Sequence, residues 1–225
     1  MNQKLAARLL RAFTFVACIS SAEAVVVHES ASLGSPTGGF SANWEQYLGS
    51  RFSLTQSYQI TSIGAFVEAN SFCIACNNDL IFAALIKLDS ANALPSFQVS
   101  ALGSNVLAFS TFAPPSPGGE FLAPVSVELG PGSYALLIGS GLFGAFGNSY
   151  MPIVGADFPG SSYFYANVVT NTWVNGSFND VRFVVEGDIA PVPSPIVGAG
   201  LPGLLLGFAG VGYMAYRRKL IASMP

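Results

Sequence analysis

The middle of the chain is a series of short segments in which apolar residues either alternate with polar ones or run without interruption. Residues 125–129 alternate, which is the period of a strand with one face buried. Residues 80–88 and 134–139 are apolar almost throughout, as is typical of strands that are buried on both faces. For residues 80–88 a helix remains the alternative, because periodicity alone does not separate the two over so short a run.

Further extended segments are predicted from their aromatic and β-branched content. They cover residues 51–54, 58–69, 106–112, 163–169 and 179–186. Residues 28–44, rich in Ser and Gly, are expected to form a loop or an edge strand. The Pro- and Gly-rich residues 114–119 interrupt two strand patterns, and Gly130-Pro131-Gly132 does the same, so both are expected to connect strands rather than domains.

Two of these segments carry finer predictions. In residues 58–69, Tyr58 and Ile60 fall on one face and Ile63, Ala65 and Val67 on the other. This one-residue slip predicts a β-bulge near residues 62–64.

In residues 179–186, the apolar side chains recur at every second position and are expected to face the core: Val181, Phe183 and Val185. Arg182 and Glu186 then lie on the opposite face of the same strand. The segment is therefore predicted to contribute one apolar and one charged face to its sheet.

About eight short strands with Gly/Pro turns and no amphipathic helix predict an all-β fold. The expected architecture is an antiparallel β-sandwich, jelly-roll-like, formed by residues 25–190. No internal repeat is visible, which argues against a solenoid or a propeller.

The C-terminal segment has a different pattern. Residues 196–216 contain no charge, and as one helix these 21 residues span about 30 Å, the thickness of the hydrocarbon part of a bilayer. Arg217, Arg218 and Lys219 follow at once and are expected to hold that end on the cytoplasmic side. The sequence therefore predicts one C-terminal transmembrane helix, with a basic tail at 217–225 and an exported domain before it.

The N-terminus has the order of a secretory signal peptide. Lys4, Arg8 and Arg11 precede a short apolar stretch, and Ala22 and Ala24 occupy the −3 and −1 positions of a signal peptidase site. Residues 1–24 are thus expected to be removed by signal peptidase after passage through the secretory translocon. Two alternatives are an uncleaved anchor, for which the apolar stretch is short, and a lipoprotein signal that ends at an acylated Cys18.

The C-terminal residues 191–225 contain Val192-Pro193-Ser194-Pro195, then the apolar run, then the basic cluster. This three-part order resembles the sorting signal of the PEP-CTERM proteins, which are exported by Gram-negative bacteria, although Ser194 stands where that family has Glu. The resemblance implies recognition by an exosortase-type membrane enzyme at residues 192–195. It also implies a periplasmic precursor anchored in the inner membrane, and a final place at the cell surface or in the exopolysaccharide matrix.

Charge narrows the possible partners of the exported domain. Residues 25–190 contain three cations and eleven acids, a net charge of −8, although the whole chain carries only −3. A surface of this sign repels phosphate backbones, so nucleic acid is not expected as a partner.

Cys73 and Cys76 are expected to form a disulfide, since an exported chain folds in an oxidising compartment. A zinc site needs two nitrogen or sulfur ligands in addition to these cysteines, and only His28 is available to supply one. A thioredoxin-like site needs a βαβ context, which the pattern does not provide. No metal or other cofactor is predicted.

Catalysis has few candidates. His28, the only histidine, is expected to lie in a loose N-terminal segment, and no motif links Glu45 with Asp157 as a pair of carboxylates. Candidate calcium ligands at Asn77-Asn78-Asp79, Asp180 and Asp188 lack the spacing of a known motif.

Some aromatic side chains are able to stack on sugar rings if they are exposed, whereas core packing is the alternative for each. They are Trp44, Tyr150, Tyr163, Tyr165 and Trp173. We therefore expect a non-enzymatic binding or structural role, with exopolysaccharide as a possible partner. The alternatives are a glycan- or surface-modifying hydrolase and an ice- or carbohydrate-binding module.

Overall fold

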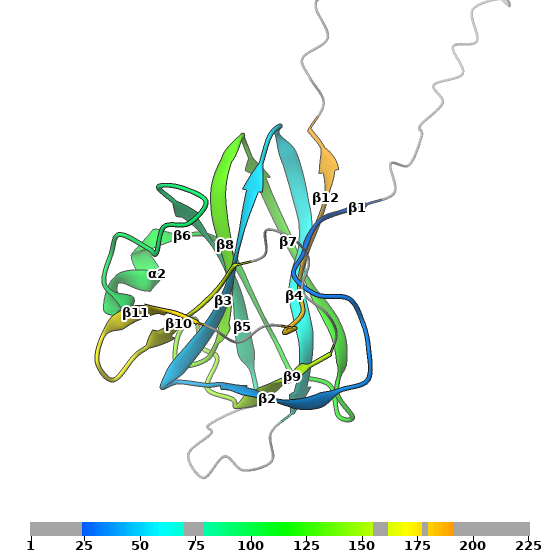
Figure 1. Ribbon diagram of the computed structural model, residues 1–225, viewed down its shortest axis with the longest axis vertical. Helices are drawn as coiled ribbons and strands as arrows, with labels where there is room; N and C mark the ends of the chain where they lie inside the picture. Colours follow the sequence, from blue (N-terminus) through cyan, green and yellow to red (C-terminus); the bar gives the residue numbers. More distant parts are fainter. Residues whose placement is uncertain (1–23, 70–78, 155–161, 177–179, 191–225) are drawn as a thin grey trace, which may run out of the picture. The chain divides into compact units, whose positions relative to one another are not determined.

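In the computed structural model, twelve strands form two six-stranded antiparallel sheets over the described residues, which are 24–69, 79–154, 162–176 and 180–190 (Figure 1). The first sheet consists of β1 (Val25–Glu29), β12 (Phe183–Ile189), β4 (Tyr58–Ala69), β9 (Ser149–Ile153) and β2 (Thr37–Ala42), with β7 (Gly119–Leu129) paired to the other side of β4. The second sheet has the order β11 (Thr172–Asn175), β10 (Ser162–Asn167), β3 (Gln46–Leu54), β8 (Gly132–Gly139), β5 (Ile81–Leu88) and β6 (Val106–Phe112).

The prediction of an all-β sandwich is thereby confirmed, with more strands than the sequence indicated. Apolar side chains from both sheets meet in one cluster, which we call the inner cluster. From the first sheet it contains Ile63 and Phe183, and from the second sheet Leu85 and Leu136, all of them fully buried. The alternation within β7 and β12 gives each of these strands one face for this cluster.

The predicted bulge in β4 is present, one to two residues earlier than expected. Pairing of β4 with β12 shifts between Ile60 and Ser62, where Thr61 is the extra residue. Pairing with β7 shifts at the same place, but there β7 carries one residue more than β4. Because of this shift Ile60, Ile63 and Val67 all point into the inner cluster and are fully buried.

β5 and β8 are buried on both faces, as their continuous apolar sequences predicted. Their second set of side chains, including Phe82 and Leu137, faces away from the first sheet and forms an outer cluster. Residues of the connection between β5 and β6 cover this cluster, and Val99 and Leu102 are buried in it. The cover contains a 3₁₀ turn, η1 (Val99–Ala101), and a one-turn helix, α2 (Leu102–Asn105), which the sequence did not indicate (Figure 1).

Arg51, on the outer face of β3, fastens this cover to the sheet. Its guanidinium lies 4.7 Å from the centre of the Phe164 ring and donates to the carbonyl of Ala93 at 2.9 Å and to the side-chain oxygen of Asn175 at 2.5 Å. One buried cation thus joins the covering segment, β3 and β11.

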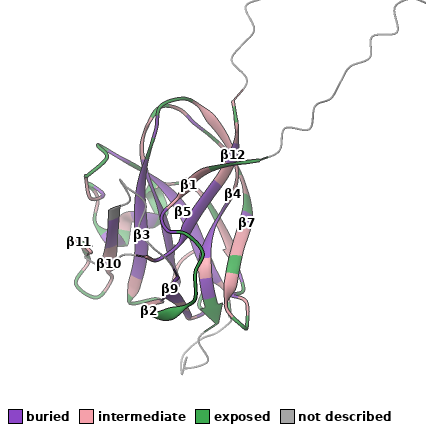
Figure 2. Cartoon of the chain, turned by 45° about the vertical axis from the view of Figure 1, so that its right-hand side comes forward, coloured by how far each residue is buried: buried purple, intermediate pink, exposed green. Residues whose placement is uncertain are grey.

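The outer face of the first sheet is polar instead. Gln59 donates to the hydroxyl of Ser126 at 3.2 Å, and Ser62 donates to the carboxylate of Glu186 at 2.6 Å. Figure 2 shows the contrast: β3 and β5 are buried along most of their length, whereas β7 alternates between buried, intermediate and exposed residues.

Arg182 also lies on this polar face, opposite its apolar neighbours as predicted. It forms ion pairs with Glu29 of β1, at 2.6 Å, and with Glu120 of β7. The Arg182 side chain is only 8% exposed, and it also donates to the carbonyl of Ala31. It therefore connects three strands of the first sheet.

By its internal contacts the chain divides at residue 190, so all twelve described strands belong to one unit. Several predicted features lie outside the described residues: the Ala22 position of the signal peptidase site, the Cys73–Cys76 pair, the sorting motif at 192–195, the apolar run at 196–216 and the charges at 217–219. Within the described residues, no helix has the length and hydropathy needed to cross a membrane.

Candidate functional site

A hollow of about 400 Å³ opens where four connecting segments meet at the edge of the outer cluster. Its lining is Trp44, Tyr47, Val99, Ser100, Gly141, Leu142, Phe146 and Val168, and we call it the Trp44 pocket. Four of these residues, including Tyr47 and Leu142, belong to or pack on the outer cluster, which forms the floor. Trp44 and Phe146 are 53% and 43% exposed, so the rim presents two large aromatic rings to solvent.

Trp44 is held at the tip of the tight turn between β2 and β3. The Asn43 side-chain oxygen accepts hydrogen bonds from the backbone N–H groups of Glu45, at 2.9 Å, and Gln46, at 3.0 Å. This is the turn that Asn favours, because its side chain replaces a backbone acceptor. The carbonyl of Glu45 accepts from the N–H of Val168 at 2.9 Å, which ties the turn to the opposite wall of the pocket.

The wall that carries Phe146 is the loop after β8. The N–H of Gly141 donates to the carbonyl of Ala145 at 2.6 Å, closing the loop on itself. Gly141 has φ +89°, and a β-carbon there would lie 3.2 Å from the β-carbon of Trp44. Glycine is thus required both by the backbone conformation and by the close approach of Trp44.

The pocket lining contains no carboxylate, amine or guanidinium. Its one titratable side chain is Tyr47, and burial raises the pKa of that phenol to about 12, so that it is neutral at pH 7. An exposed polar group is available at Ser100, whose N–H donates to the side-chain oxygen of Asn171 at 2.8 Å. Aromatic faces with a few hydroxyl and backbone groups suit an uncharged ring that is apolar on its faces and polar at its edge.

Trp44 is exposed and lines a pocket, but the other aromatic candidates have different environments. Tyr163 is buried in the inner cluster, and Tyr165 packs against it. Trp173 packs on the outer cluster and donates from its ring nitrogen to the carbonyl of Phe97 at 2.6 Å. Tyr150, in β9, is partly exposed and pairs with Ser41 and Glu68. Core packing is therefore the observed role of Tyr163, Tyr165 and Trp173.

The expectation that His28 lies in a loose segment is wrong. β1 pairs with β12, and within it His28 stacks on Phe52, with ring centres 4.9 Å apart. The His28 Nε2 atom also lies 3.1 Å from the hydroxyl oxygen of Ser50, and burial lowers the pKa of His28 to about 4. The apolar residues before His28 pair with β12, and this pairing holds the imidazole in place although it lies close to the predicted cleavage site.

This histidine and serine do not form an accessible catalytic pair. Ser50 is fully buried, and within the described part of the chain no carboxylate is bonded to the imidazole. A nucleophile that substrate does not reach has no partner to attack. The pair instead connects β1 to the inner face of β3.

Of the two candidate catalytic carboxylates, the structure describes only Glu45. Glu45 is exposed in the Trp44 turn, and Asp157 lies outside the described residues. Among the described residues, no group of three or more His, Cys, Asp or Glu side chains is placed to hold a metal ion. Asp180 has φ +66°, a turn conformation, and one carboxylate oxygen of Asp188 is buried without a hydrogen-bond partner among the described residues.

Sequence reasoning selected Trp44 but missed the rest of the pocket. The only signal for Phe146 was its place in a Gly-rich connection, residues 139–147, where large apolar side chains are not needed for a turn. Ser100 and Val168 carry no signal, because only the packing of separate loops brings them together.

Comparison with known proteins does not assign the chain to a family. No model of a known protein family matches the chain, and no curated protein is significantly similar to it.

Proposed function

We propose that this chain is an exported, non-enzymatic surface or matrix protein whose sandwich domain binds neutral sugar rings in the Trp44 pocket. The observation that carries the proposal is a pocket with two exposed aromatic rings and no charged side chain. Its volume of about 400 Å³ lies within the range of ordinary small-ligand sites, roughly 300–1,000 Å³. A sugar ring presents C–H groups on its faces, which suit stacking on such rings.

The charge of the domain supports a neutral polymer rather than an acidic one. Residues 25–190 carry a net charge of −8, which opposes the approach of uronate- or sulfate-bearing chains. One stacking contact contributes on the order of 1 kcal/mol, so each pocket binds weakly and retention depends on many copies along one polymer.

The export and anchoring part of the proposal rests on the ends of the sequence. Residues 1–24 would be the signal peptide, residues 191–225 a PEP-CTERM-type sorting signal for an exosortase-type enzyme, and residues 196–216 a transmembrane helix that holds the precursor. A jelly-roll-like sandwich between them would be displayed on the periplasmic side and then at the cell surface or in the exopolysaccharide matrix.

The test is calorimetric titration of the full-length protein, in mild detergent, with the neutral oligosaccharides cellohexaose and maltohexaose and with an acidic oligomannuronate. We expect weak binding of at least one neutral probe and none of the acidic one. Trp44→Ala should weaken this binding by about tenfold, which is about 1.4 kcal/mol. Leu33→Ala is the control, since Leu33 is a large apolar residue that is 56% exposed and lies outside the pocket.

Two results would contradict the proposal. One is equal binding by Trp44→Ala and the unchanged protein. The other is release of shortened sugars from the probes, with loss of that release in Glu45→Gln, which would favour the hydrolase instead.

A further inference from the structure

β6 is the edge strand of the second sheet. In the described part of the chain it pairs with β5 on one side only, so its other side presents unpaired backbone N–H and C=O groups. The strand is seven residues long and reads VLAFSTF, without a charge or a proline. Leu107 and Phe109 are 43% and 49% exposed on it. An exposed, uncharged and apolar edge of this kind favours pairing with another strand.

The other edge strands carry features that oppose pairing. β7 contains Pro124, which donates no hydrogen bond, and it has Glu120 and Glu128 on its solvent side. β1 is five residues long and interrupted by a register shift, and β2 is interrupted in the same way at Gly38. β11 has only four residues. β6 is therefore the longest edge strand without a charge or a proline.

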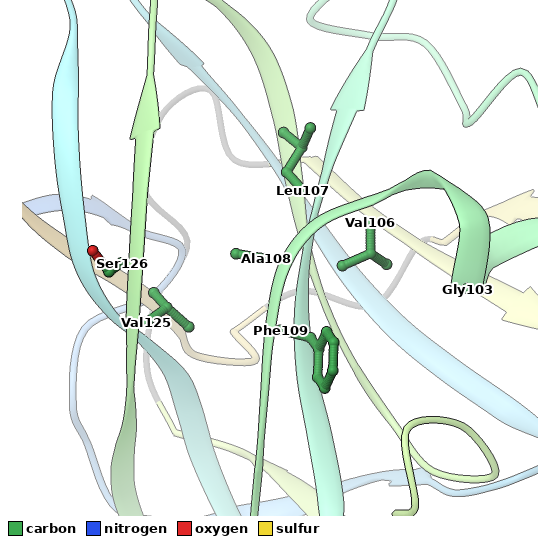
Figure 3. A pocket seen from close by; sticks show the side chains of 7 residues that line it. All are labelled: Gly103, Val106, Leu107, Ala108, Phe109, Val125 and Ser126. Carbon is green, nitrogen blue, oxygen red and sulfur yellow. The ribbon is translucent and has the colours of Figure 1, made fainter.

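A groove of about 370 Å³ runs along β6 on the side of β7 (Figure 3). Its lining is Gly103, Val106, Leu107, Ala108, Phe109, Val125 and Ser126, none of which ionises. In Figure 3 the side chains of Ala108 and Val125 point toward one another across the groove, whereas Leu107 and Phe109 point away from it. Phe109 stacks on Phe143, with ring centres 4.2 Å apart and planes 17° apart, so its orientation is fixed by packing.

We propose that β6 pairs with β6 of a second copy of this chain, antiparallel and about a two-fold axis. An antiparallel pair is complementary to itself, because each strand supplies the donors and acceptors that the other lacks. The two second sheets then form one continuous sheet across the contact.

Charge favours this edge as the place where two copies meet. With a net charge of −8 on residues 25–190, two copies repel each other over most of their surface. The β6 edge and its groove are neutral, so at this contact the copies meet without facing carboxylates. The pairing also covers Leu107 and Phe109, the two exposed large apolar side chains of β6.

Sedimentation velocity of the full-length protein in density-matched detergent tests the proposal. We expect a dimer whose fraction increases with protein concentration. Leu107→Lys puts a charged side chain on the contact in both copies, where lysine on an edge strand opposes pairing, and should weaken the dimer by about tenfold or more. Val169→Lys is the matched control, because it puts the same charge on an apolar residue that is 72% exposed in the β10–β11 turn.

Hydrogen exchange separates edge pairing from other association. Amides of residues 106–112 should exchange more slowly at high protein concentration, and this protection should be lost in Leu107→Lys while its circular dichroism stays unchanged. A protein that stays monomeric at about 100 µM would overturn the proposal and leave the edge to an extended peptide of another protein. Dimerisation equal in Leu107→Lys and the unchanged protein would also overturn it, and would place the contact elsewhere. Neither result depends on the Trp44 pocket, so the proposed function and this inference fail separately.

Discussion

The two sheets differ in what lies on their outer faces. The first sheet carries a row of polar side chains there, with the Gln59–Ser126 and Ser62–Glu186 hydrogen bonds and the ion pairs of Arg182. The second sheet carries Phe82 and Leu137, which are fully buried beneath the segment that contains η1 and α2. The same antiparallel pairing thus supports one sheet with a polar outer face and one sheet whose central strands β5 and β8 are buried on both faces.

This difference has a functional side. A polar outer face needs no cover, so the first sheet presents short polar groups to solvent. An apolar outer face must be covered, and the loops that cover it converge from distant parts of the sequence. The Trp44 pocket lies among those loops. The candidate binding site therefore exists because the outer cluster has to be covered by loops.

The largest expected effect tests whether the outer cluster contributes as much to the free energy of unfolding as the inner cluster. Leu136 and Leu137 are neighbours on β8, both fully buried, and point into the inner and the outer cluster respectively. Replacing either leucine by alanine should reduce the free energy of unfolding by about 3 kcal/mol, because each leaves a cavity. Urea unfolding of Leu136→Ala and Leu137→Ala side by side gives the comparison directly. A loss in Leu137→Ala smaller than in Leu136→Ala by about 2 kcal/mol or more would mean that the cover collapses onto the cavity or opens, and that the outer cluster is not an equivalent core.

The second effect is a pH dependence of stability that we expect at the inner cluster and not at the outer cluster. His28 borders the inner cluster, and its pKa of about 4 in the folded protein lies below the ordinary value of 6.5. Between these two values the unfolded chain binds a proton that the folded chain does not, so stability is greatest above pH 6.5 and falls as the pH falls to 4. The full shift corresponds to about 3 kcal/mol at most.

Unfolding by urea at pH 7, 5.5 and 4 measures this loss, and hydrogen exchange locates it. Protection should decrease first in β1 and β3, while the outer cluster keeps its protection. His28→Gln does not titrate and retains a group able to bond Ser50, so it should remove most of the pH dependence over this interval. A pH profile unchanged in His28→Gln would show that other groups cause the loss.

The smallest of the three effects concerns the polar face. Arg182→Met removes the cation that joins β12 to Glu29 and Glu120, whose side chains are 34% and 27% exposed. Because water reaches both carboxylates, the expected loss is about 1–2 kcal/mol rather than that of a fully buried pair. Lys87→Met is the control, since it removes an exposed cation from β5 and should change stability by less than about 0.5 kcal/mol. If the two substitutions changed the free energy of unfolding equally, the ion pairs of Arg182 would not contribute to stability.

Local pattern predicted the longer strands, but it missed the short strands β9 and β11 and the packing of the connecting segments. The continuous apolar sequence of β5 predicted burial on both faces, and the phase slip within β4 predicted its bulge, because both are properties of consecutive residues. The covering segment has no periodicity: Val99 and Leu102 are buried through contacts with strands far away in sequence. The same reason explains the site, since Trp44 stood out as an aromatic residue while its pocket is made by loops that meet only in three dimensions.

The position of β12 determines when this domain is able to complete its fold. The last strand lies between the first strand, β1, and β4, and its Gly187 pairs with Val25. A chain that emerges from its N-terminus onward has no neighbour for β1 until more than 150 residues later. Completion of the first sheet must therefore wait until β12 has been synthesised, and during that delay β1 has no strand partner and β4 presents one unpaired edge. The domain therefore completes its fold late, through a contact between its first and last strands. A chaperone that covers the unpaired edges until then would protect the chain from aggregation.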